Sequence, residues 1–294
     1  MDDGYFVFAG RDSRDMGITI EEFPKIAKPE RRLTHYNVPG RLGSIATWDG
    51  GYNNVTISYK VWFEATAQRP LAQFVADLNA WLGSGGVQYQ KLYDSYSYEN
   101  IDENSVRVDR PYIREALFKG PLIVESTYNE IGSATITFTC RPQLYLPGAF
   151  DEIPIGTAHY PTLDYNGIMG VRGCVAKPLI LLTKPGTVKF HYGNPDNYRW
   201  IEVVMPEQDD SPRIFIDCED ETIYQVGDDG VKRSINGYCR AGGYTSISPF
   251  PEIPDPYEDP NVLNMLNICF YAASPNSAQT VPQDAKLIPR LFVL

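Results

Sequence analysis

Carboxylates gather in the C-terminal half of the sequence. They are Asp209, Asp210, Asp217, Glu219, Asp220, Glu221, Asp228 and Asp229. Two carboxylates held roughly 5 to 9 Å apart suffice for glycoside hydrolysis, and carboxylate oxygens also bind calcium, but the ligand order of an EF-hand is missing. Acidic residues more often lie at solvated turns and strand edges, where they prevent unwanted pairing. We therefore predict neither a catalytic pair nor a calcium site.

Other catalytic patterns are missing from the sequence. The three histidines, His35, His159 and His191, are far apart and form no zinc motif. A nucleophile elbow of the Gly-x-Ser-x-Gly type is absent. The glycines of segment 83–86 follow a predicted helix and lack the Lys-Ser/Thr of a phosphate loop. The sequence thus predicts a protein that is not an enzyme, with no catalytic residue, metal or cofactor.

Charge and composition limit the partners. The chain of 294 residues carries a formal net charge of -11, which argues against sequence-specific binding of nucleic acid. An acidic wall would instead let DNA slide past. Neither a signal peptide nor an apolar run long enough to cross a bilayer is expected. Five scattered cysteines without a CxxC spacing are typical of reduced, mostly buried residues.

The elements that position these side chains are predicted to be mainly strands. Abundant Tyr, Pro and Gly favour short strands joined by turns. Apolar residues at helical spacing predict one amphipathic helix over 70–82, with Pro70 at its first position and Gly83 at its end. They are Leu71, Phe74, Val75, Leu78, Trp81 and Leu82.

The first half of the chain has a clear strand pattern. Segment 28–64 predicts a half-buried meander of three strands, with glycine turns at Pro39-Gly40 and at Asp49-Gly50-Gly51. Segment 89–106 is rich in tyrosine and predicts part of a long hairpin. Alternating residues then predict two strands with one buried face each. These residues are Val55, Ile57, Tyr59, Val61 and Phe63 in one strand, and Ala134, Ile136, Phe138 and Cys140 in the other.

The periodicity stops between residues 141 and 167, and we place a domain boundary there, giving domains 1–147 and 148–294. The second domain has regular short strands with hairpin turns near 194–197 and 227–230, which predict a sandwich or jelly roll.

Tyr198 and Trp200 lie in one of these strands. Aromatic rings stack on sugars, so a carbohydrate-binding module that recognises a host cell-wall glycan is the alternative function. A wall-degrading enzyme is the third.

Several short motifs resemble the distal tail protein family of long-tailed (siphovirus-type) bacteriophages. In the first half they are Pro29-Glu30-Arg31, Val38-Pro39-Gly40-Arg41, Gly43, Asp49-Gly50 and Tyr52. In the second half the resemblance is looser and involves segments 215–220, 234–236, 250–251 and 288–291. Two departures are Leu42, where the family commonly has an acidic residue, and the proline-rich segment 252–261, which replaces a compact turn.

The resemblance implies a fold and a role. It implies an N-terminal β-sandwich with one helix that closes into a hexameric ring, and a C-terminal galectin-like β-sandwich. The implied function is a structural virion protein at the distal tip of the tail, assembled in the host cytoplasm. It would join the tail tube protein to a tail-tip lysin or fibre protein, let DNA pass, and contact the tape measure and receptor-binding proteins. No membrane is implied.

A repeated contact between identical chains needs complementary patches rather than a pocket, and aromatic side chains are common anchors of such patches. The predicted ring or partner interface comprises Val38, Pro39, Gly40, Arg41, Tyr93, Tyr96 and Tyr98.

Overall fold

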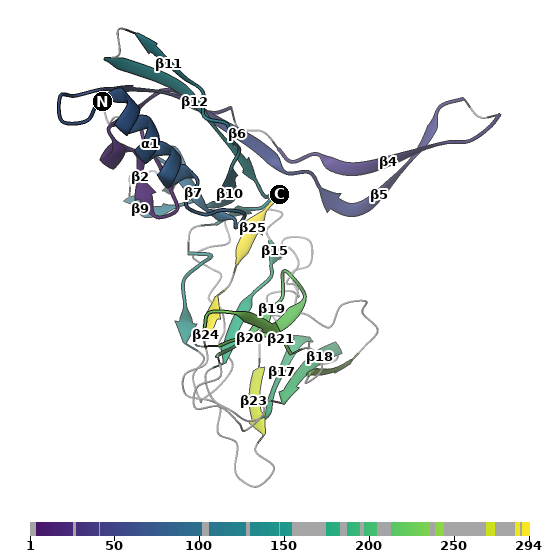
Figure 1. Cartoon of the computed structure of the whole chain (residues 1–294). Coiled ribbons are helices and arrows are strands. Elements are labelled where there is room, and N and C mark those ends of the chain that lie inside the picture. Colours follow the sequence, from purple (N-terminus) through teal and green to yellow (C-terminus); the bar gives the residue numbers. More distant parts are fainter. Residues whose placement is uncertain are drawn as a thin grey trace. The chain divides into compact units, whose positions relative to one another are not determined.

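The structure is a computed structural model of the chain. It describes residues 4–25, 28–40, 42–101, 106–127, 130–146, 148–154, 175–182, 187–194, 197–204, 213–227, 229–235, 239–243, 269–273, 286–288 and 290–294. The chain divides into two compact units (Figure 1). Unit 1 is Met1–Leu144 with Leu294, and unit 2 is Tyr145–Val293. The functions predicted for the two domains stay predictions.

Unit 1 is built on an eight-stranded antiparallel sheet. Its strand order is β2-β1-β7-β10-β12-β6-β3, and β11 pairs with β12. The strands are β1 (Phe6–Phe8), β2 (Arg11–Asp12), β3 (Ile18–Glu22), β6 (Val55–Glu64), β7 (Gln90–Asp94), β10 (Arg114–Phe118), β11 (Val124–Thr127) and β12 (Ile131–Cys140). A short 3-10 helix, η1 (Ser13–Met16), connects β2 to β3.

The longest ladder of this sheet joins β6 to β12 over ten residue pairs, from Ile131 opposite Glu64 to Cys140 opposite Val55. The predicted inward residues of β12 are all buried, and those of β6 are buried except for the half-buried Ile57. The predicted alternation of inward and outward side chains is therefore confirmed in both strands, because each strand has one face against the core and one toward solvent.

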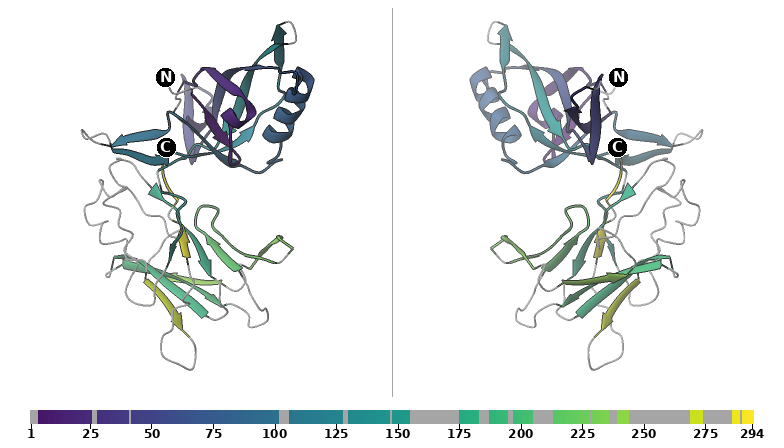
Figure 2. Two further views of the ribbon diagram at one scale, coloured as in Figure 1. Left: turned by 90° about the vertical axis from the view of Figure 1, so that its left-hand side faces the viewer. Right: turned by 90° about the vertical axis from the view of Figure 1, so that its right-hand side faces the viewer.

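Helix α1 (Leu71–Leu82) packs on this sheet (Figure 2) and confirms the predicted amphipathic helix. Phe74 stacks on Phe63 of β6 with ring centroids 4.0 Å apart. The indole Nε1 of Trp81 donates a hydrogen bond to the Phe8 carbonyl oxygen at 3.1 Å. Pro70 is the N-cap rather than the first helical residue, a shift of one position. The Gly83 amide donates to the Asn79 carbonyl at the C-terminal end.

The predicted meander of segment 28–64 is confirmed in its three strands and in its first turn at Pro39-Gly40, but its predicted burial and pairing are wrong. Strands β4 (Arg31–Asn37) and β5 (Ser44–Tyr52) pair only with each other, as a separate two-stranded sheet. All of β4 and most of β5 are exposed. This hairpin extends away from the body of unit 1 (Figure 1), and we call it the arm, residues 31–52. Only β6 of the three predicted strands enters the main sheet.

The second predicted turn of this segment is also wrong, because Asp49-Gly50-Gly51 lies inside β5. Leu33 pairs with Trp48 and Arg31 pairs with Tyr52, so one residue of β4 faces three residues of β5. Gly50 adopts a φ of +87°, and the Gly51 amide donates to Asp49 Oδ1 at 2.8 Å. These residues form a bulge that bends the strand without reversing it. The chain leaves the arm through Asn53 and Asn54 instead.

The predicted tyrosine-rich hairpin is present in the described residues. Its lower part is the β7–β10 pair of the main sheet, and its upper part is a ribbon of β8 (Tyr98–Ile101) and β9 (Val106–Pro111). Residues 102–105, in its predicted tip, lie outside the described residues.

Unit 2 contains three antiparallel sheets, with strand orders β14-β24-β16-β19-β20-β21, β22-β18-β17-β23 and β13-β25-β15. The predicted hairpins near 194–197 and 227–230 are the β17–β18 and β20–β21 pairs. The predicted mainly β fold class is thus confirmed, and its galectin-like character stays a prediction. The strands are β13 (Leu144–Tyr145), β14 (Ile153–Pro154), β15 (Val175–Ala176), β16 (Leu179–Leu182), β17 (Thr187–Asn194), β18 (Asn197–Val204), β19 (Arg213–Asp217), β20 (Thr222–Val226), β21 (Lys232–Ser234), β22 (Cys239–Gly243), β23 (Cys269–Ala273), β24 (Lys286–Ile288) and β25 (Leu291–Val293).

Candidate partner-binding surface

The arm carries apolar side chains on both of its faces. Leu33 pairs with Trp48, and their exposed fractions are 47% and 46%. Tyr36 pairs with Ile45, with exposed fractions of 55% and 37%. Side chains alternate between the faces of a strand, so the two pairs lie on opposite faces. Exposed apolar side chains that lie together are common where a protein binds another macromolecule.

Polar contacts stiffen the end of the arm nearest the body. Arg32 Nε lies 2.6 Å from Asp49 Oδ2, and the Arg31 guanidinium lies over the Trp48 ring at 4.8 Å from its centroid. The Gly51 amide and then the Arg32 guanidinium donate to Asp49 and lower the pKa of its carboxyl. The bulge is therefore held in one conformation while the arm stays exposed.

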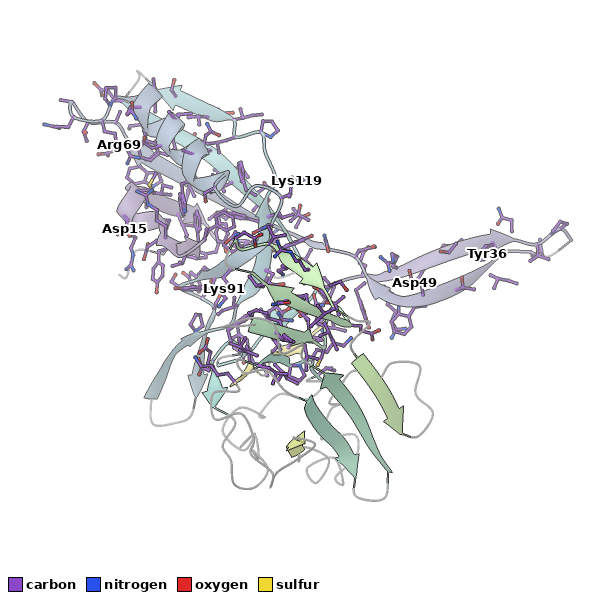
Figure 3. The ribbon with its side chains drawn as sticks, turned by 60° about the horizontal axis from the view of Figure 1, so that its bottom comes forward. Asp15, Tyr36, Asp49, Arg69, Lys91 and Lys119 are labelled. Atoms are coloured by element: carbon purple, nitrogen blue, oxygen red, sulfur yellow. The ribbon has the colours of Figure 1, made fainter. Side chains whose placement is uncertain are left out.

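Three predicted interface residues, Val38, Pro39 and Gly40, lie in the connection between β4 and β5 at the far end of the arm. Val38 is 40% exposed, and Gly40 has a φ of +80°, which favours glycine. Figure 3 shows Tyr36 well along the arm and Asp49 nearer the body. Arg41 lies outside the described residues.

The predicted tyrosines lie elsewhere in unit 1. Tyr93 is on β7, between β1 and β10, and burial raises its pKa. Tyr96 is exposed and packs edge-on against Phe23, with ring centroids 3.8 Å apart. Tyr98 begins β8, and its side chain lies outside the described residues. The structure therefore divides the predicted interface among three sheets, β4-β5, the eight-stranded sheet and β8-β9, rather than gathering it in one patch.

Two of the clustered carboxylates, Asp217 and Glu219, belong to a polar network in unit 2. Arg290 Nη1 lies 2.6 Å from Asp217 Oδ1 and 3.6 Å from Glu219 Oε2. The Tyr145 hydroxyl donates to Glu219 at 2.9 Å. Burial alone would lower the pKa of Arg290, but the two carboxylates outweigh burial and raise it. This arrangement places one cation beside both carboxylates and links the beginning, middle and end of unit 2.

The other described carboxylates of the cluster lie at exposed turns. Asp220 and Glu221 are exposed, and Asp229 pairs with Arg233 in the turn between β20 and β21. Asp209, Asp210 and Asp228 lie outside the described residues. Within the part of the chain that the structure describes, no group of three or more His, Cys, Asp and Glu residues is placed to hold a metal ion. Nor does any helix there have the length and apolarity to span a membrane.

The predicted glycan residues lie on β18, an interior strand of the four-stranded sheet. Tyr198 pairs with Gly193, and Trp200 pairs with His191 and Gly242. The side chains of Tyr198 and Trp200 lie outside the described residues, and glycan binding stays a prediction. Of the other two histidines, His35 lies on the arm, with its Nδ1 3.2 Å from Ser44 Oγ. His159 lies outside the described residues.

Sequence reasoning missed a groove of unit 1. It lies where the end of β6, the first turns of α1 and the β11–β12 hairpin meet. Small residues, Ala65, Ala67 and Ala72, are among those that line this junction. The groove is lined by Glu64, Ala65, Thr66, Ala67, Pro70, Leu71, Ala72, Val75, Val124, Ser126, Glu130 and Ile131.

Comparisons with known proteins bear on this arrangement. Neither the protein-family models nor the curated proteins include a match. Among solved structures, the chain is similar to the crystal structure of the SPP1 Dit (gp 19.1) protein, described as a paradigm of the hub adsorption apparatus in phages that infect Gram-positive bacteria. The TM-score is 0.52 at 13% sequence identity, over 98% of this chain and 97% of that chain. At this identity the likeness concerns the fold, and it agrees with the family resemblance in the sequence. The chain therefore has the fold of a Dit protein.

Proposed function

We propose that this chain is a structural hub protein of a bacteriophage tail, which forms a hexameric ring at the distal end and joins the tail tube to the tail-tip proteins. The observation that carries the proposal is the arm, since apolar side chains on both faces of an exposed hairpin require partners. The fold likeness to Dit, which spans nearly both chains, supports the same role. In this proposal the protein catalyses no reaction.

The charge of the chain fits a passage for DNA. A ring with a net charge of -11 on each copy would repel the phosphate backbone. DNA would then move through the ring without adhering to its wall. A tail-tip lysin or fibre protein, the tape measure protein and the receptor-binding protein are the further proposed neighbours.

Mass photometry and native mass spectrometry of the purified chain over a wide concentration range test the ring. We expect a species of six chains that grows with concentration at the expense of the monomer. Electron microscopy of intact particles with an antibody against the chain should place it at the distal end of the tail. A strict monomer at every concentration, together with no label on the tail, would end the proposal.

A further inference from the structure

Strand β11 is an open edge of the main sheet of unit 1. In the described part of the chain, its backbone is hydrogen-bonded to β12 and to no other strand. The ladder runs from Val124 opposite Ala134 to Thr127 opposite Ile131 without a shift in register. Unpaired amide and carbonyl groups along such a regular edge are a template on which a strand of another chain can form.

The edge strand β3 differs from β11 in this respect. Its register with β6 shifts between Ile20 and Glu22, and the exposed Glu21 and Glu22 end the strand. Bulges and charged side chains are features by which proteins prevent strand edges from pairing with other chains. Strand β11 has one charged residue, Glu125, and no bulge. Of these two edges, β11 is therefore the one suited to pairing.

The groove lies beside this edge, on the core side of the sheet. Val124 of β11 lines the groove and pairs with the buried Ala134, so both side chains lie on the core face. Val124 is nevertheless only half-buried. Leu71 and Val75 of α1, which are also half-buried, line the groove as well. Helix α1 thus leaves this end of the core face partly uncovered.

The size and charge of the groove fit a segment of polypeptide. Its volume is about 1230 Å³, which exceeds the roughly 300–1,000 Å³ of most small-molecule sites. The described residues that line it include two exposed carboxylates, Glu64 and Glu130, and no Lys or Arg. Neither carboxylate forms an ion pair with another described residue. A segment that carries both apolar and basic side chains would complement this surface.

We infer that β11 and the groove together bind one extended segment of a different tail protein. The segment adds a strand to β11, places its apolar side chains in the groove, and places Lys or Arg beside Glu64 and Glu130. Each copy of this chain carries a net charge of -11, so a basic segment of another protein matches the carboxylates better than a second copy does. This inference rests on the proposed hub function and names the kind of chain that the hub holds.

A synthetic peptide tests the surface on the whole chain. The probe is a fluorescent peptide of alternating Val and Thr with Lys at both ends, and its control has a central Pro, which cannot donate to a strand ladder. Fluorescence anisotropy should show saturable binding of the probe and at least about tenfold weaker binding of the control. The amides of residues 124–127 should exchange hydrogen more slowly when the probe is bound. No binding, or equal binding of both peptides, would overturn the inference.

Matched substitutions on α1 test the groove. Ala72 is exposed and lines the groove, whereas Ala76 is exposed one turn later and does not line it. Ala72→Lys places a charge among apolar walls and repels the Lys residues of the probe, so it should weaken binding at least about tenfold. Ala76→Lys should leave the affinity within about twofold of the unsubstituted chain. Identical circular dichroism spectra would show that both variants fold, and equal affinities of the two would count against the groove.

The carboxylates have a separate readout, the dependence of binding on salt. Glu64→Gln combined with Glu130→Gln should weaken binding of the probe and make it less sensitive to salt, because ions screen exposed charges. Glu125→Gln is the control, since Glu125 is exposed on β11 but does not line the groove. A salt dependence unchanged by the double substitution would contradict a basic partner.

Cross-linking of purified tails identifies the natural occupant. A carbodiimide joins a carboxylate directly to a neighbouring Lys amine, and mass spectrometry locates the bond. We expect Glu64 or Glu130 joined to a Lys within an apolar segment of another tail protein. A bond to a second copy of this chain, or no bond at either glutamate, would overturn the inference and leave the hub proposal standing. Absence of the chain from purified tails would instead refute the hub proposal.

Discussion

The Tyr59 hydroxyl donates a hydrogen bond of 2.8 Å to Asp94 Oδ2 within the core of unit 1. Asp94 is buried, and its Oδ1 accepts from the Ser97 hydroxyl and the Tyr96 amide. Tyr59 therefore fixes β6 to the end of β7, although β10 and β12 lie between these strands in the sheet. The contact therefore connects β6, the strand after the arm, to the point where β7 leads into the ribbon of β8 and β9.

Removing this hydroxyl should destabilise unit 1. Tyr59→Phe leaves a buried carboxylate with one fewer donor, which costs about 1–3 kcal/mol of unfolding free energy. Urea unfolding followed by circular dichroism measures the loss. Tyr96→Phe removes an exposed hydroxyl from the same region and should change stability by less than about 0.5 kcal/mol. Equal stability of the two variants would contradict the structural role of the Tyr59 contact.

The same tyrosine should make stability fall in alkali. Burial, followed by the charge and hydrogen bond of Asp94, raises the pKa of Tyr59 above its ordinary value. In the unfolded chain Tyr59 ionises above about pH 10, whereas the folded chain keeps its proton. Its stabilising contribution is therefore complete below pH 10 and decreases above it, by up to about 1.4 kcal/mol per pH unit. Urea unfolding between about pH 8 and 11 should show a shallower decline in Tyr59→Phe than in the unsubstituted chain.

Arg290 should be essential to unit 2. Arg290→Met leaves the buried Asp217 and its neighbour Glu219 without their cation, and breaking such a pair costs about 3–5 kcal/mol. The matched control is Arg233→Met, which breaks the exposed pair with Asp229 and should change stability little, because solvent screens that pair. Thermal unfolding of both variants measures the difference. A small loss for Arg290→Met would show that the network contributes little to the fold.

Assembly should change the emission of one tryptophan. Trp48 is about half exposed on the arm, so covering it with a neighbouring chain should shift its fluorescence to shorter wavelength as the concentration rises. Trp48→Phe should assemble without that shift, since the other three tryptophans lie in β6 and α1 of unit 1 and in β18 of unit 2, outside the arm: Trp62, Trp81 and Trp200. A shift that persists in Trp48→Phe would locate the burial elsewhere.

Cys140 and Cys218 should resist alkylation in the folded chain. Both are free and buried, and burial raises the pKa of Cys140 to about 12 and that of Cys218 well above its ordinary value. The reactive thiolate is therefore scarce at neutral pH. Peptide mass mapping after iodoacetamide treatment should find both unmodified in native buffer and both modified in denaturant. Modification in native buffer would indicate that the strands holding them open readily.

The parts of unit 1 that sequence predicted well are those with one buried face. In β12 every second side chain points into the core, and in α1 the inward side chains recur every three or four residues. These spacings therefore identify the inward side chains from the sequence. The arm lacks that regularity, because Leu33 and Tyr36 lie on opposite faces. Apolar residues out of phase in a strand were thus the signal that segment 31–52 has no core of its own.

The errors arose where local chemistry permits two outcomes. An Asp-Gly-Gly sequence suits a hairpin turn and a bulge equally well, and the pairing of Tyr52 with Arg31 decides between them. The groove could not be predicted because three segments distant in sequence build it. Likewise, nothing in the spacing of Asp217 and Glu219 indicates that Arg290, about seventy residues later, lies beside both.

The bulge at Gly50 sets the bend between the arm and the strand that follows it. If the arm takes part in the proposed ring, this bend would influence the rotation from one copy to the next. A rotation that divides a full circle evenly gives a closed object, and a slightly different one gives an open helical filament. The bend at Gly50 would then decide whether the same contacts build a closed ring or a filament that continues to grow.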